Sequence, residues 1–167
     1  FILPKPIAGT FTGKLLFALR DARTAAVDAL GGITAAETRS ARHQLAADLL
    51  VLQGLAAQLP YDPAPETPKA GKLRLVHDRL ARLLPLTADI EQRIETLATS
   101  ERRAPDGLAV FVADTRAWIS AGAVEQDESA IALIERARSL QTRLGLEATT
   151  TDDRLAANLA GHLAELI

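Results

Sequence analysis

The chain has 167 residues, a formal net charge of −2, and neither cysteine nor methionine. The absence of cysteine excludes disulfides, thiol catalysis and cysteine-based zinc sites. The nearly balanced charge is unlike the basic footprint of a nucleic-acid-binding protein, so we expect no nucleic-acid partner. Alanine, leucine and arginine recur, whereas valine and isoleucine are sparse, which favours helices over strands.

We therefore predict an all-α fold, a multi-helix bundle of about six helices with one long, proline-kinked central helix. Residues 1–167 are expected to form a single soluble helical domain. The length suits one domain with its own core, and no apolar run reaches the roughly 18 residues of a membrane span.

Two helices are predicted in the first third of the chain. The first starts near Thr10 or Thr12 and ends before the Gly31–Gly32 pair. The second starts at a capping-box pattern over residues 34–37 and ends before a proline-rich loop at residues 60–68. Their apolar stripes are Leu15, Leu19, Ala22, Ala26 and Leu30, and Leu45, Leu49, Leu52, Ala56 and Leu59.

The third predicted helix is the spine of the bundle. Its apolar residues recur in alternating steps of three and four, which keeps one helix face continuously apolar. The positions of this stripe are Leu73, Val76, Leu80, Leu83, Thr87, Ile90, Ile94 and Leu97. Pro85 lies inside this pattern without disturbing its phase, so we predict one kinked helix rather than two.

Three shorter helices are predicted in the last third of the chain. They cover residues 107–120, residues 127–145 and the stretch after residue 151, and Asp106 is placed to cap the first of them. The apolar residues they present are Leu108, Phe111, Val112 and Trp118; Ile131, Ile134, Ala137, Leu140 and Leu144; and Leu155, Leu159, Leu163 and Leu166.

Residues able to carry chemistry do not gather into a recognisable motif. His43, His77 and His162 each stand alone on a different predicted helix, without the paired spacing of a metal site. Asp152 and Asp153 start the last helix, where negative charge complements the helix dipole, so capping explains them better than acid–base catalysis. We predict no catalytic residue, no metal, no cofactor and no enzymatic activity.

Five residues are candidates for binding a ligand. Arg74, Arg79 and Arg82 can attract a carboxylate, because a guanidinium matches its two oxygens. Tyr61 and Trp118 are the large aromatics with a polar tip, and either can line a pocket. The alternative is that the arginines form a solvated helix back and that the aromatics simply pack.

The start of the chain is basic. Lys5, Lys14 and Arg20 all precede the first acid, Asp21. Such a start is typical of a loop just cytoplasmic of a membrane helix, although a solvated helix face explains three charges nearly as well.

Two motifs in the middle of the chain occur together: the turn LPYD at residues 59–62 and the helical segment HDRLARLLPL at residues 77–86. This combination resembles the fusaric acid resistance (FUSC) family of aromatic carboxylic acid exporters, in which an LPYD-like turn precedes a helix reading roughly QDRLALLLPLLSAIEDRL. His77 stands where the family often has glutamine, and Thr87 replaces an apolar residue. The opening FILPKP also resembles the point where the sixth membrane helix of such exporters ends.

The resemblance implies a soluble cytoplasmic domain between the two membrane halves of a bacterial inner-membrane exporter, with residues 1–9 leading in from a membrane helix. It further implies an assembly or gating role, with the membrane halves of the same polypeptide as partners and an aromatic acid as a candidate ligand. We also expect a homo-oligomer, because long amphipathic helices pack between protomers as well as within one. Two rival hypotheses stay open: a stand-alone helical adaptor that recognises a partner helix, and a ligand-sensing bundle that holds aromatic acids.

Overall fold

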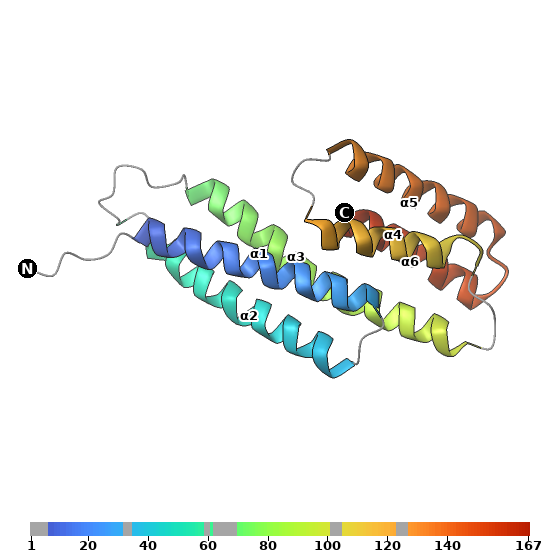
Figure 1. Cartoon of the computed structure of the whole chain (residues 1–167), viewed down its shortest axis with the longest axis horizontal. Helices are drawn as coiled ribbons and strands as arrows, with labels where there is room; N and C mark the ends of the chain where they lie inside the picture. The colour runs from blue at the N-terminus through green and yellow to red at the C-terminus, as the bar shows by residue number, and fades with distance from the viewer. Residues whose placement is uncertain (1–6, 32–34, 59–60, 62–69, 101–104, 123–126) are drawn as a thin grey trace, which may run out of the picture. The chain divides into compact units, whose positions relative to one another are not determined.

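The computed structural model of the chain describes residues 7–31, 35–58, 61, 70–100, 105–122 and 127–167 (Figure 1). All regular structure in these ranges is α-helical, so the predicted all-α fold is confirmed. The helices of the described residues are α1 (Ile7–Gly31), α2 (Ala35–Gln58), α3 (Ala70–Thr99), α4 (Leu108–Ala121), α5 (Asp127–Glu147) and α6 (Thr151–Leu166). Helix α1 begins at Ile7, a few residues before the predicted start near Thr10 or Thr12.

The contacts within the chain divide it into two compact units. The first unit comprises residues 1–25 and 36–84, and the second comprises residues 26–35 and 85–167. Helices α1 and α3 each contribute residues to both units, and the predicted single domain stays a prediction. Helix α3 continues as an α-helix through Pro85, as predicted, whereas its kink is untested.

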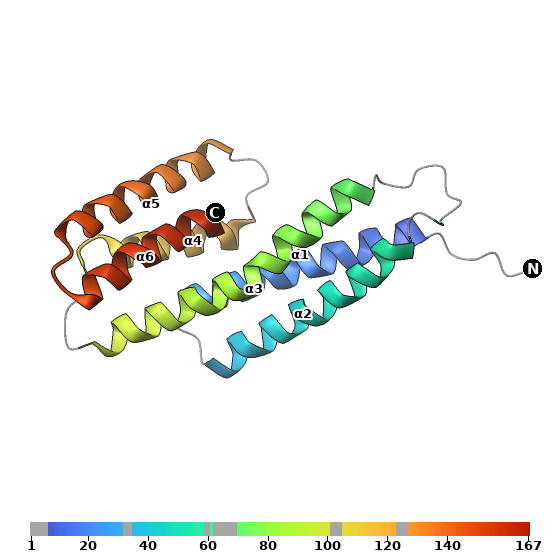
Figure 2. The same ribbon diagram turned by 180° about the vertical axis from the view of Figure 1, so that it is seen from behind.

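The core of the first unit is built by α1, α2 and the first half of α3, which run alongside one another in both views (Figures 1 and 2). Its buried residues are Phe11, Ala18, Ala22, Leu45, Leu49, Leu52, Leu73 and Leu80. The prediction for Leu19 was wrong, because this side chain is exposed. The face of α1 that meets the other helices carries Ala18 and Ala22, and Leu19 lies about 100° of helix rotation away from Ala18.

The core of the second unit gathers α4, α5, α6 and the second half of α3, together with the end of α1. Its buried residues are Leu30, Ile90, Leu97, Leu108, Phe111, Ala137, Leu140, Leu144, Ala156, Ala157, Leu159, Ala160 and Leu163. The prediction for Ile131 was wrong, because it is exposed. The apolar stripe of α5 passes through Leu133 instead, which packs against the core.

The helix starts show one correction and one confirmation. Asp106 does not cap α4: the cap is Gly107, which has a left-handed φ of 86° and makes no side-chain cap. The main-chain carbonyl of Asp106 instead accepts a hydrogen bond from Arg143 Nη2 at 3.1 Å. At α6, Thr150 and Asp153 form a capping box, which confirms the capping role of the acidic start.

Several predictions lie outside the described residues: the lead-in at residues 1–6, the capping box that begins at residue 34, and the loop at residues 60–68 apart from Tyr61. Three of the four residues of the LPYD turn fall in the same category.

Candidate functional site

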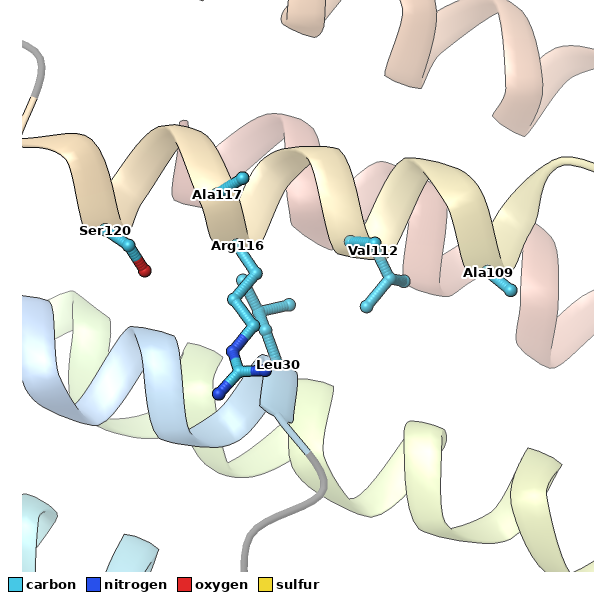
Figure 3. A pocket seen from close by; sticks show the side chains of 7 residues that line it. Leu30, Ala109, Val112, Arg116, Ala117 and Ser120 are labelled. Atoms are coloured by element: carbon cyan, nitrogen blue, oxygen red, sulfur yellow. The ribbon is translucent and has the colours of Figure 1, made fainter.

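A pocket of about 450 Å³ lies in the second unit, along one face of α4 (Figure 3). The residues that line it are Leu30, Ala109, Val112, Ala113, Arg116, Ala117 and Ser120. Leu30 belongs to the end of α1 and the other six to α4. The wall is therefore mostly aliphatic, with one guanidinium and one hydroxyl.

The sequence of α4 explains why this face is open. Positions 109, 112, 113, 116, 117 and 120 recur at steps of three and four, so they share one side of the helix. The opposite side holds Leu108, Phe111 and Thr115, which are buried. Alanine on the open side leaves room for a ligand where a larger side chain would fill the space.

Arg116 is the charged group of the pocket. Its side chain points from α4 toward the end of α1 (Figure 3), where a Cβ on Gly31 would stand only 2.8 Å from Arg116 Nη2. Gly31 therefore makes the space that the guanidinium occupies. Among the described residues, Arg116 has no carboxylate partner. One role of this cation is to complement the carbonyl end of the α1 dipole, and its donors also suit a carboxylate ligand.

A second, more apolar pocket adjoins the first. It measures about 260 Å³ and shares Ala109 and Val112 with the Arg116 pocket. The residues that line it are Ile94, Leu97, Ala98, Leu108, Ala109, Val112 and Leu159. The two pockets together place a cation beside an apolar hollow, which suits a small molecule with a charged end and a hydrophobic body.

A polar cluster ties α3 to α6 within the second unit. Arg93 Nε donates to Asp89 Oδ2 at 2.6 Å, and His162 Nδ1 lies 2.5 Å from the same oxygen. The Arg93 hydrogen bond, with a smaller contribution from His162, lowers the pKa of Asp89 against the opposing effect of burial.

A third pocket, of about 280 Å³, is lined by Gly107, Arg136, Ser139, Leu140 and Arg143. Both of its arginines already have partners. Arg136 Nη1 lies 2.6 Å from Asp114 Oδ2 and its guanidinium stacks 5.4 Å from the Phe111 ring, while Arg143 donates to the Asp106 carbonyl. The contacts of these two arginines therefore hold α5 against α4 and the turn before it.

The residues predicted to bind a ligand lie elsewhere. Arg74, Arg79 and Arg82 are exposed on α3 in the first unit, and Tyr61, also in that unit, is 85% exposed. Trp118 lies half-buried on α4 in the second unit, and its indole Nε1 is buried without a hydrogen-bond partner among the described residues. None of the five lines the Arg116 pocket, and ligand binding by them stays a prediction.

Sequence reasoning missed Arg116, although a signal was present. Arg116 is the basic residue of α4, and alanines stand on either side of it at positions 113 and 117. The histidines have structural surroundings: His43 is exposed, and His77 Nε2 lies 3.3 Å from the Leu49 carbonyl, between α3 and α2.

The whole chain, residues 1–167, matches the fusaric acid resistance protein family (FUSC), and the protein belongs to that family. Members of this family are membrane transporters rather than enzymes. No curated protein and no solved structure matches the chain. Within the described ranges, none of the helices has the length and hydrophobicity needed to cross a bilayer.

Proposed function

We propose that this chain is a non-catalytic domain of an inner-membrane FUSC-type efflux transporter for aromatic carboxylic acids or related toxic compounds. In this proposal the domain lies on the cytoplasmic side, joins the membrane halves of the same polypeptide, and takes part in gating by holding the acid at the Arg116 pocket. The observation that carries the proposal is a guanidinium without a carboxylate partner among the described residues, set beside an apolar hollow.

The chemistry of an aromatic acid fits this arrangement. A guanidinium binds a carboxylate through two parallel charge-assisted hydrogen bonds, and Ser120 lines the pocket on the same face of α4. The ring would lie against Ala109 and Val112 and reach the adjoining apolar pocket, where burial of apolar surface favours binding. Neither contact involves bond chemistry, so the site binds and releases its ligand without turnover.

Calorimetry on the 167-residue chain tests this proposal with benzoate as the ligand. Benzyl alcohol removes the carboxylate and cyclohexanecarboxylate removes the aromatic ring, so the two analogues separate the contributions of charge and ring. We expect Arg116→Gln to weaken benzoate binding about tenfold or more, because it removes hydrogen bonds to a charged group.

Arg154→Gln is the matched control, since Arg154 is an exposed arginine of α6 in the same unit. Equal affinity for benzoate and benzyl alcohol, or unchanged binding by the Arg116 variant, would contradict the proposal. Loss of binding in an Arg74, Arg79 and Arg82 triple variant would move the site to the exposed face of α3.

A second candidate function is assembly of a homo-oligomer through the outer face of α2. Its exposed residues from Ser40 to Gln58 include no Asp, Glu, Lys or Arg, and among them Leu50 is 70% exposed. A helix face without exposed charge between Ser40 and Gln58 is suited to pairing with an identical copy, because no like charges are brought together there. Light scattering after size exclusion tests this candidate: Leu50→Glu should yield monomers, whereas Leu146→Glu, on an exposed leucine of α5, should not.

The transporter context has its own test against the stand-alone adaptor and the ligand-sensing bundle. Sequencing the complete reading frame should reveal apolar runs of about 20 residues on both sides of this segment. Polar flanking sequences would favour the adaptor or the sensor instead.

A further inference from the structure

Helix α1 reverses the usual distribution of large and small apolar residues. Beyond Phe11, its fully buried contacts with the first core come from Ala18 and Ala22, and Ile7 and Leu15 pack against that core while only partly buried. Three of its large side chains are instead exposed: Leu16 is 63% exposed, Phe17 is 51% exposed and Leu19 is 44% exposed. Three large apolar residues within one turn of exposed helix form a patch that typically marks an interaction site.

The surroundings of this patch are cationic. Lys14 Nζ lies 6.0 Å from the centroid of the Phe17 ring, and the Arg20 guanidinium lies 5.4 Å from it. Arg23 is exposed one turn farther along. Arg20 Nε lies 3.6 Å from Asp21 Oδ1 and Lys14 Nζ lies 4.0 Å from Asp48 Oδ1, but these two carboxylates are only 15% and 8% exposed. None of the exposed residues in the described part of α1 is acidic.

We propose that this face of α1, the Phe17 face (Lys14, Leu16, Phe17, Leu19, Arg20 and Arg23), docks on the surface of an anionic lipid bilayer. Leucine and phenylalanine would enter the boundary between headgroups and acyl chains, while the basic side chains contact lipid phosphates, as in amphipathic helices that lie on membranes. The inference does not depend on the Arg116 pocket.

Charge complementarity selects the membrane over a second copy of the chain. A symmetric pairing of two Phe17 faces would bring Lys14 and Arg20 of one copy against the same cations of the other, which disfavours the contact. The exposed residues of α2 from Ser40 to Gln58 lack this obstacle because none of them is Lys or Arg. An anionic surface, in contrast, matches the apolar centre of the Phe17 face and its basic rim at once.

The test is co-sedimentation of the 167-residue chain with lipid vesicles. We expect binding to phosphatidylcholine vesicles that contain about 30% phosphatidylglycerol, and binding at least about tenfold weaker to pure phosphatidylcholine. Raising the salt concentration should weaken the binding, because it screens the contribution of the basic side chains.

Two variants separate the apolar and basic contributions. Leu16→Ser with Phe17→Ser should reduce binding to the anionic vesicles about tenfold or more, and Lys14→Gln with Arg20→Gln should remove the preference for anionic lipid. Leu50→Ser is the matched control, because Leu50 is as exposed as Leu16 but has uncharged surroundings on α2 of the same unit. All substituted side chains are at least partly exposed, and far-ultraviolet circular dichroism checks that the helices persist.

Absence of binding to anionic vesicles overturns the proposal, as does a Leu16 and Phe17 double variant that binds them like the parent chain. If that variant instead loses self-association and keeps vesicle binding, the Phe17 face pairs copies of the chain and the membrane proposal is wrong. Arg116→Gln should leave vesicle binding unchanged, so failure of the ligand proposal and failure of this one give different results.

Discussion

The two units of the molecule are stabilised in different ways. Contacts between helices of the second unit include several polar pairs, such as Asp89 with His162, Ser100 with Asp152 and Asp114 with Arg136. In the described part of the first unit, apolar packing is accompanied by polar contacts that include a 4.0 Å pair between Lys14 and Asp48 and the His77 contact with the Leu49 carbonyl.

The outer surfaces of the two units also differ, in how their exposed apolar residues are distributed. In the first unit, most of the large exposed apolar residues are grouped, three on α1 and the pair Leu50 and Val51 on α2, whereas Tyr61 and Leu75 stand apart. In the second unit, Val110, Ile131 and Leu146 are far apart along the chain, and the hydrophobic surface is instead concave, around the Arg116 pocket. The first unit is thus suited to docking on extended surfaces, whereas the second is suited to a small ligand.

The largest expected effect tests whether the two cores are independent. Phe11 and Phe111 are both fully buried, one in each core, so replacing either with alanine should cost about 3–5 kcal/mol of its own unit's stability. Urea unfolding would be followed by far-ultraviolet circular dichroism for both units and by fluorescence of Trp118, the sole tryptophan, for the second unit. Phe111→Ala should shift the fluorescence transition strongly, and Phe11→Ala should shift it little.

Coincident transitions that move together in both variants would break this comparison, because they would show that the two units unfold cooperatively as one. If the circular dichroism and fluorescence transitions occur at different urea concentrations, the two units unfold separately, and the free energy of unfolding of each can be measured.

A smaller effect is expected at the start of α6. Thr150→Ala removes the hydroxyl that accepts from the Asp153 main-chain N–H, and loss of such a cap costs about 1 kcal/mol. Thr142→Ala is the control, because its hydroxyl only donates back to the Arg138 carbonyl one turn earlier on the exposed side of α5. Thermal unfolding followed by Trp118 fluorescence should show a lower midpoint for the Thr150 variant alone, and an equal decrease in both would refute the capping explanation.

The same capping box predicts a pH dependence. Hydrogen bonding by Thr150, followed by Thr149, lowers the pKa of Asp153 in the folded chain. Stability from a carboxyl with a lowered pKa is present above its ordinary range and is lost as the pH falls through the lowered value. The stability difference between the parent and Thr150→Ala should therefore shrink below about pH 4.

The smallest effect concerns the polar cluster of the second unit. Asp89→Asn should cost roughly 0.5 kcal/mol, a modest value because the Asp89 side chain is 37% exposed and solvent screens its ion pairs. Asp78→Asn in the first unit is the control, with a carboxylate that is 69% exposed beside His77, and should produce no measurable change. Urea titrations at pH 7 provide the comparison, and equal losses in the two variants would remove the distinction between the units.

The pKa of Asp89 is lowered chiefly by its hydrogen bond with Arg93. The contribution of Asp89 to stability should therefore also depend on pH in the acidic range. It should be present at neutral pH and decline as the pH falls below about 4 and the carboxylate takes up a proton. A parent–variant difference that stays constant down to pH 2 would contradict this assignment.

The linear pattern of residues was sufficient for the secondary structure. The steps of three and four from Leu73 to Leu97 predicted α3, because a helix of 3.6 residues per turn places such positions on one face. The motifs in residues 59–86 resemble the FUSC family, and the match over the whole chain confirms that resemblance. These conclusions need only the periodicity of apolar residues and short sequence motifs, both of which are present in the sequence.

Which apolar residues are buried was decided by tertiary packing. Leu19 and Ile131 continue plausible apolar stripes, yet the faces that meet other helices pass through Ala18 on α1 and Leu133 on α5. Helical periodicity constrains the rotation of a helix only loosely when alanines and leucines both qualify as apolar. Close approach of neighbouring helices then selects the alanine face.

The candidate site was likewise beyond the reach of the sequence. The pocket around Arg116 also includes Leu30, and its guanidinium lies beside Gly31. Both residues are at the end of α1, distant in the chain, and they meet α4 only in the folded second unit. The sequence by itself determined six helices and a family, because these depend on residues close together in the chain. Tertiary structure alone decided where a guanidinium meets an apolar hollow and which face of α1 stays outside, because both depend on how distant helices pack.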